Sequence, residues 1–103
     1  MGKGEIVTPD EQLNRLDAEL KRFNSEHANA PGTLRLSDKC LRACSRWKWG
    51  QHGFVVSDGE ACGMMNGSDA EARSALLSVL KARMIHKVEF VAGADVLEVV
   101  PAA

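Results

Sequence analysis

The chain has no tyrosine, and its aromatic residues make up only 5% of 103 residues. We therefore expect a core built mainly from Leu, Val, Met and Ala side chains. No apolar run is long enough to span a membrane. The first seven residues, MGKGEIV, lack the apolar stretch of a secretory signal, and we expect residues 1–7 to form a flexible leader.

Cysteine is sparse and odd in number: Cys40, Cys44 and Cys62. An odd count in a short chain without a secretory signal favours reduced thiols and a cytoplasmic location over a disulfide framework. The spacing also permits a zinc site formed by the three cysteines and His52. Because Cys40 and Cys44 are separated by three residues rather than the two of a tight knuckle, we favour small apolar core residues and predict no metal.

Composition indicates an ordinary globular protein. Hydrophobic residues make up 45% and charged residues 26%, and the length fits one domain over residues 1–103. The net charge of −1 is unevenly distributed. Residues 29–56 carry five basic groups and one acidic group, whereas the two flanking segments are acidic.

Two helices have clear start signals. Thr8, Pro9 and Glu11 form a capping box, which predicts a helix from Pro9 to about Glu26. Its apolar stripe is expected to pack on the protein's own sheet rather than on a second chain; the stripe contains Leu13, Leu16, Leu20 and Phe23. Ser68 followed by Glu71 predicts a second capped helix over Asp69–Ile85.

The segments between and after these helices predict a short helix and four strands. Pro31 and Gly32 interrupt helical structure, and Ser37 is a candidate cap for a helix from Asp38 to about Trp47. Asp58-Gly59 between apolar residues predicts a hairpin over residues 54–62. Residues 88–91 and 96–100 predict a second hairpin. The expected class is α+β, with helices on one face of a small antiparallel sheet in the order α-α-ββ-α-ββ.

The segment Arg35–His52 concentrates basic residues and contains both tryptophans of the chain. In a helix running from Asp38, Trp47 shares the face of Cys40 and Cys44, so we expect it to be buried and Trp49 to be exposed. Met64 and Met65 are also expected at the surface, where methionine suits adaptable contacts. The predicted partner-binding residues are Arg42, Arg46, Lys48, Trp49, Met64 and Met65. The alternative is a solvated helix face with one tryptophan in the core.

No pattern in the chain indicates catalysis. A Cys–His pair lacks any flanking signature, and the glycine-containing segment before Ser68 matches no phosphate-binding motif. We therefore predict that the protein is not an enzyme and needs no cofactor.

The favoured function is a small cytoplasmic protein that binds and modulates a protein partner, because Arg and Trp are enriched at binding hot spots. By analogy of size alone, it resembles accessory or inhibitor proteins of bacteria and phages. The alternative is a nucleic-acid-binding module that uses residues 35–52, and the third possibility is a metal-stabilised binding module. The sequence predicts no membrane partner and leaves monomer and homodimer open.

Overall fold

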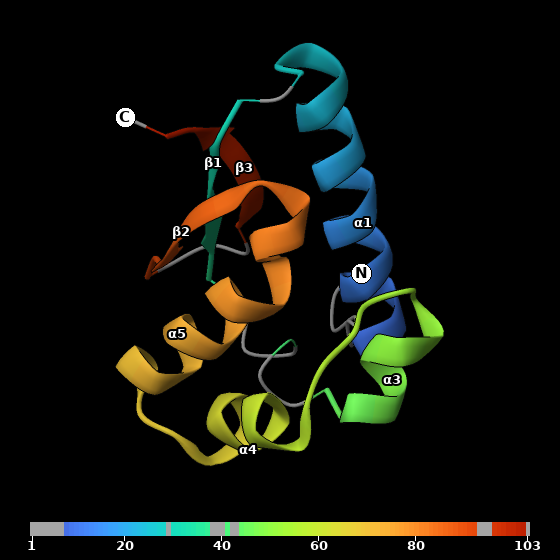
Figure 1. The fold of residues 1–103 in the computed structure, drawn as a ribbon, viewed down its shortest axis with the longest axis vertical. Coiled ribbons are helices and arrows are strands. Elements are labelled where there is room, and N and C mark those ends of the chain that lie inside the picture. The colour runs from blue at the N-terminus through green and yellow to red at the C-terminus, as the bar shows by residue number, and fades with distance from the viewer. Residues whose placement is uncertain (1–7, 29, 38–40, 42–43, 93–95, 103) are drawn as a thin grey trace, which may run out of the picture.

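The fold, seen here in a computed structural model, is described for residues 8–28, 30–37, 41, 44–92 and 96–102 (Figure 1). The leader predicted at residues 1–7 lies outside this range. The elements follow the order α1 (Pro9–Glu26), β1 (Gly32–Leu36), α3 (Arg46–Gln51), α4 (Asp58–Asn66), α5 (Asp69–Leu80), the 3₁₀ turn η1 (Lys81–Arg83), β2 (Ile85–Phe90) and β3 (Leu97–Pro101). In the described part of the chain, no helix is both long enough and apolar enough to cross a bilayer.

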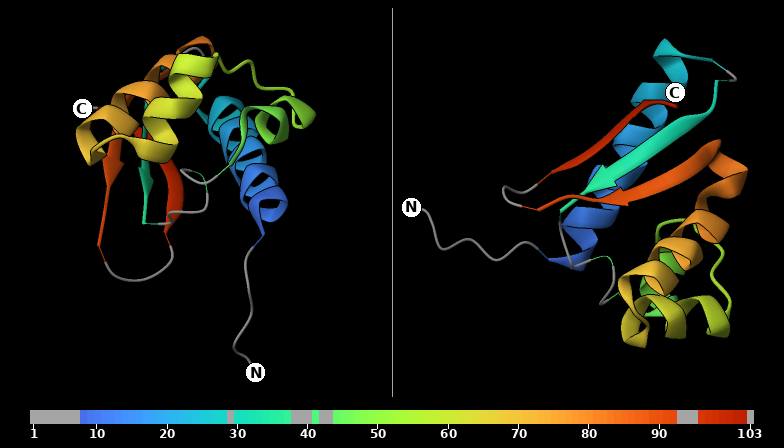
Figure 2. Two further views of the ribbon diagram at one scale, coloured as in Figure 1. Left: turned by 90° about the horizontal axis from the view of Figure 1, so that it is seen from below. Right: turned by 90° about the vertical axis from the view of Figure 1, so that its left-hand side faces the viewer.

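The three strands form a mixed sheet in the order β2-β1-β3. β1 pairs in parallel with β2 and antiparallel with β3. The helices α1 and α5 pack on one face of this sheet (Figure 2). The predicted α+β class with helices on one face is therefore confirmed, whereas the prediction of a wholly antiparallel sheet is wrong.

Helix α1 has the predicted bounds and start. The Thr8 hydroxyl accepts a hydrogen bond from the Glu11 backbone N–H at 3.2 Å. In return, the Glu11 carboxylate accepts a hydrogen bond from the Thr8 backbone N–H at 3.4 Å. All four residues of the predicted apolar stripe are buried in the core of the same chain. The stripe fits closely on the sheet at Gly32, where a Cβ atom would lie 3.0 Å from the Phe23 ring and 2.8 Å from Val99.

The predicted hairpin over residues 54–62 is wrong, because α4 begins at Asp58. Ser57 caps this helix by accepting a hydrogen bond from the Glu60 N–H at 3.1 Å, and the Glu60 carboxylate accepts one from the Ser57 N–H at 2.8 Å. The reciprocal cap satisfies two helix N–H groups. This cap stabilises a helix more than Asp58-Gly59 favours a turn. Gly59 accordingly does not have the positive φ that a hairpin turn requires.

The C-terminal hairpin is also wrong, although both of its strands exist. β2 and β3 do not pair with each other, because β1 lies between them.

The central strand β1 was not predicted. Residues 28–33 were expected only to interrupt a helix, but Gly32 begins this strand. The alternation of Leu34, Arg35 and Leu36 was the signal for this strand, since Leu34 and Leu36 are buried and Arg35 lies on the opposite face.

Two helix boundaries also differ from the predictions. Helix α5 starts at the predicted Ser68 cap but ends at Leu80, and β2 begins at Ile85. Between them, Met84 adopts φ of 67°, a left-handed conformation that stops a helix. Of the helix predicted over Asp38–Trp47, residues 38–40, 42 and 43 lie outside the described residues, and a new helix starts at Arg46.

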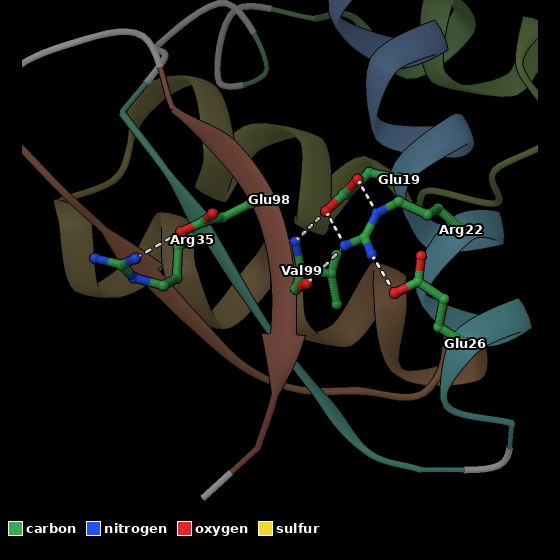
Figure 3. Close-up of polar contacts among 6 residues, drawn as sticks. All are labelled: Glu19, Arg22, Glu26, Arg35, Glu98 and Val99. Atoms are coloured by element: carbon green, nitrogen blue, oxygen red, sulfur yellow. Dashed lines mark hydrogen bonds and ion pairs between the residues drawn. The ribbon is translucent and has the colours of Figure 1, made fainter.

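Side chains of α1 bond to the outer edge of β3 (Figure 3). The Glu19 carboxylate accepts a hydrogen bond from the Val99 N–H at 2.8 Å, and the Arg22 guanidinium donates one to the Val99 carbonyl at 3.1 Å. Arg22 is itself held by Glu19 and by Glu26. Pro101, farther along the same strand, has no N–H to offer. The helix thus occupies the backbone N–H and C=O of Val99, which an additional strand would need.

Candidate interaction surface

The orientation of the two tryptophans follows from where helix α3 begins. Ser45 caps the helix by accepting a hydrogen bond from the Lys48 N–H at 3.2 Å. With this start, Trp49 is fully buried and Trp47 is 69% exposed. The sequence prediction for the pair is therefore reversed. It assumed one continuous helix from Asp38, and the new start at Arg46 changes which residues face the core.

Trp49 anchors α3 to the protein. Its ring meets Phe54 edge to face, with centroids 5.3 Å apart. The guanidinium of Arg83 packs over the Phe54 ring, 4.9 Å from its centroid. Burial of so large a side chain is worth several kcal/mol, about 4 to 6 by the area rule. The position of α3, and with it that of Trp47, is consequently fixed by the core.

A second attachment joins α3 to the start of α1. The Asp10 carboxylate lies 3.3 Å from Lys48 Nζ and 3.0 Å from His52 Nε2. The hydrogen bonds from His52 and Lys48 lower the pKa of the Asp10 carboxyl below its ordinary value. Asp10, far away in the chain, thus contacts the middle of the short helix and its C-cap residue, and no local sequence pattern predicted this contact.

A groove of about 750 Å³ lies beside Trp47. We call it the Trp47 groove; it is lined by Ser45, Arg46, Trp47, Gly50, Gln51 and Asp58. Across one side, Arg46 Nη1 pairs with Asp58 Oδ1 at 2.9 Å. Above the indole, Lys48 Nζ lies 5.6 Å from the ring centroid, within cation–π range. The groove combines a large exposed aromatic face with a fixed polar border.

The structure divides the predicted partner-binding residues. Arg46 is exposed, Lys48 is half-buried, and both lie at or beside the Trp47 groove. Trp49 and Met64 are fully buried, so the expectation that they lie at the surface is wrong. Met64 is on the face of α4 that meets the core, and its neighbour Met65 is 48% exposed but does not line the groove. Arg42 lies outside the described residues.

One exposed apolar residue was missed. Val55 is 89% exposed in the segment between α3 and α4. It had been placed in a strand of the hairpin, which would have given it a paired neighbour. The sequence held no direct signal for its exposure, because Val55 stands between the buried Phe54 and Val56 in an apolar run.

The basic side chains of residues 35–52 that the structure describes face carboxylates. Arg35 lies between Glu98, at 2.6 Å, and Glu89, at 3.5 Å. Arg46 and Lys48 have the acidic partners given above. Paired charges create a weaker external field than free ones. For these three described residues, the external positive field is therefore weaker than the sequence alone suggests.

The described residues hold no cluster of three potential metal ligands. Cys44 is buried in the core, Cys62 is exposed on α4, and His52 contacts Asp10. Cys40, the remaining member of the zinc set that the sequence spacing permits, lies outside the described residues.

Comparisons with protein-family models, with curated proteins and with solved structures each gave no match to this chain.

Proposed function

We propose that this chain is a non-enzymatic, cytoplasmic interaction protein that binds and modulates a protein partner through the Trp47 groove. The observation that carries the proposal is the 69% exposure of Trp47 on a helix that the core holds in place. Tryptophan is among the residues most enriched in binding hot spots. Because the core holds the helix that carries Trp47, the backbone at this position loses little conformational entropy on binding.

The pairing of charges favours a protein partner over a nucleic acid. Arg46 and Lys48 already contact Asp58 and Asp10. Phosphate binding would require these cations to leave their carboxylates, and the carboxylates would repel the phosphates. A protein surface with an apolar pocket for an indole and polar groups at its rim makes no such demand.

The carboxyl groups whose pKa values are lowered also have structural roles. Glu60 and Glu71 belong to helix caps, whereas Asp17 and Glu89 belong to ion pairs. Lowered pKa values with such causes are expected from folding alone. These lowered pKa values therefore give no indication of a catalytic group among the four carboxyls.

The test is affinity capture from native extract with the full chain and with Trp47→Ala. Loss of a central tryptophan typically costs about 2 kcal/mol or more, so we expect at least about a 30-fold loss of affinity. Because the ring is exposed, stability should change by no more than about 0.5 kcal/mol, which a urea titration would confirm.

Val55→Ala is the matched control, because it removes an exposed apolar side chain that does not line the groove. We expect it to capture the partner like the wild type. Equal capture by Trp47→Ala would refute the proposed site. Capture that disappears with nuclease, or falls log-linearly with salt concentration, would instead favour the nucleic-acid alternative.

A further inference from the structure

The two edges of the sheet are treated differently. The β3 edge is occupied by Glu19 and Arg22 and interrupted by Pro101. The β2 edge has no strand beyond it among the described residues, and no helix side chain is seen bound to its backbone there. A shift in its register with β1 leaves His86 unpaired, but the pairing is regular from Lys87 to Phe90. An exposed edge strand offers backbone groups that bind a further strand.

The register identifies the free groups of β2. Leu36 pairs with Phe90, and its carbonyl accepts a hydrogen bond from the Val91 N–H at 2.9 Å. In a parallel ladder such a residue bonds to both neighbours of its partner, so the partner's own N–H and C=O turn outward. Phe90 and, two residues earlier, Val88 therefore present their backbone groups at the edge.

Two copies of β2 complement each other when they pair antiparallel about Val88. This register places Lys87 directly opposite Glu89 of the second copy, and Glu89 opposite Lys87. Within one chain these two side chains share the helix-free face of the sheet, with Lys87 Nζ 3.0 Å from Glu89 Oε2. Opposite charges at facing positions stabilise a strand pair. The two-fold axis creates two such Lys87–Glu89 pairs, one on each side of Val88.

A groove beside β2 lies where this antiparallel pairing would place Phe90 of the second copy. It has a volume of about 490 Å³ and lies between α5 and the start of the strand; it is lined by Ser74, Leu77, Ser78, Lys81, Ile85 and His86. Antiparallel pairing about Val88 brings Phe90 of the second copy opposite this end of β2. The partly exposed Phe90 ring, on the helix side of the sheet, then lies near Leu77, a partly exposed apolar residue of this groove.

From these observations we infer that the protein forms a two-fold dimer by pairing β2 with β2 of a second copy, giving one continuous six-stranded sheet. The protected β3 edges then lie at the two outer ends, so the assembly closes and does not grow into a fibre. This inference does not rest on the Trp47 groove, which is on a different part of the molecule.

Charge exchange tests the register. Sedimentation equilibrium of the full chain, from about 1 to about 500 µM, should show a reversible monomer–dimer equilibrium. Lys87→Glu and Glu89→Lys should each weaken dimerisation by at least about ten-fold, because each places like charges opposite each other twice. An equimolar mixture of the two variants should form a heterodimer, and the double variant with both exchanges should dimerise again.

The control is Glu98→Lys, which makes the same charge change on the same face but at the β3 side of the sheet. It should dimerise like the wild type, and circular dichroism should show that every variant is folded. A wild-type protein that stays monomeric over the whole concentration range would overturn the inference. So would a dimer that Lys87→Glu and Glu89→Lys leave unchanged, or a mixture of these variants that does not associate.

Discussion

Replacing Gly59 by alanine distinguishes the two structures that residues 54–62 can form. In the observed structure Gly59 is the second residue of α4, has no positive φ, and a Cβ atom there would meet nothing within 4 Å. Alanine loses less backbone entropy than glycine in a helix, by about 0.5–1 kcal/mol. We therefore expect Gly59→Ala to raise the free energy of unfolding by about 0.5 kcal/mol, since the site is in the first turn.

Gly53→Ala is the matched control. A Cβ atom at Gly53 would also meet nothing within 4 Å, but its φ is +86°. The left-handed region costs a non-glycine residue about 1–2 kcal/mol, so this variant should lose that amount. The same chemical change is thus expected to have opposite signs at two sites that are equally free of steric contact.

Urea unfolding followed by circular dichroism measures both effects, and an unchanged m-value shows that only stability has changed. In thermal unfolding, 1 kcal/mol corresponds to about 4–8 °C for a domain near this size. A loss of about 1 kcal/mol or more in Gly59→Ala would refute the reasoning, because it would indicate the positive φ of a hairpin turn at Asp58-Gly59.

Two further predictions concern buried and ion-paired polar groups. Gln12 is fully buried, and among the described residues neither polar atom of its side-chain amide has a hydrogen-bond partner, so Gln12→Met should stabilise the protein by about 1 kcal/mol in urea unfolding. A destabilised variant would show instead that the amide is satisfied, for example by a buried water. The pKa of Glu19 is lowered, first by the hydrogen bond from Arg22 and also by that from the Val99 N–H. A lowered pKa in the folded state gives stability that is present above the unfolded pKa and lost as pH falls, so unfolding midpoints should drop between about pH 5 and pH 2. Glu19→Gln should have a shallower drop, and an equal slope would contradict this assignment.

The sequence alone determined features that depend on a few neighbouring residues. The capping boxes at Thr8 and Ser68 fixed where α1 and α5 start, because both partners of each box lie three residues apart. The spacing of the apolar stripe fixed the buried face of α1. The same rule, applied at Ser57 and Glu60, would have predicted α4, and the Asp-Gly signal was wrongly preferred to it.

Tertiary structure decided the features in which distant segments compete for one position. β1 separates β2 from β3 because its buried Leu34 and Leu36 need cover from α1 and α5, and a central strand gains hydrogen bonds on both sides. The exposure of Trp47 and the burial of Trp49 depend on the start of α3 and on contacts with Phe54 and Asp10. Asp10 is far from the basic segment in sequence and Phe54 lies just beyond its end, so no pattern within the segment specified which tryptophan would face the solvent.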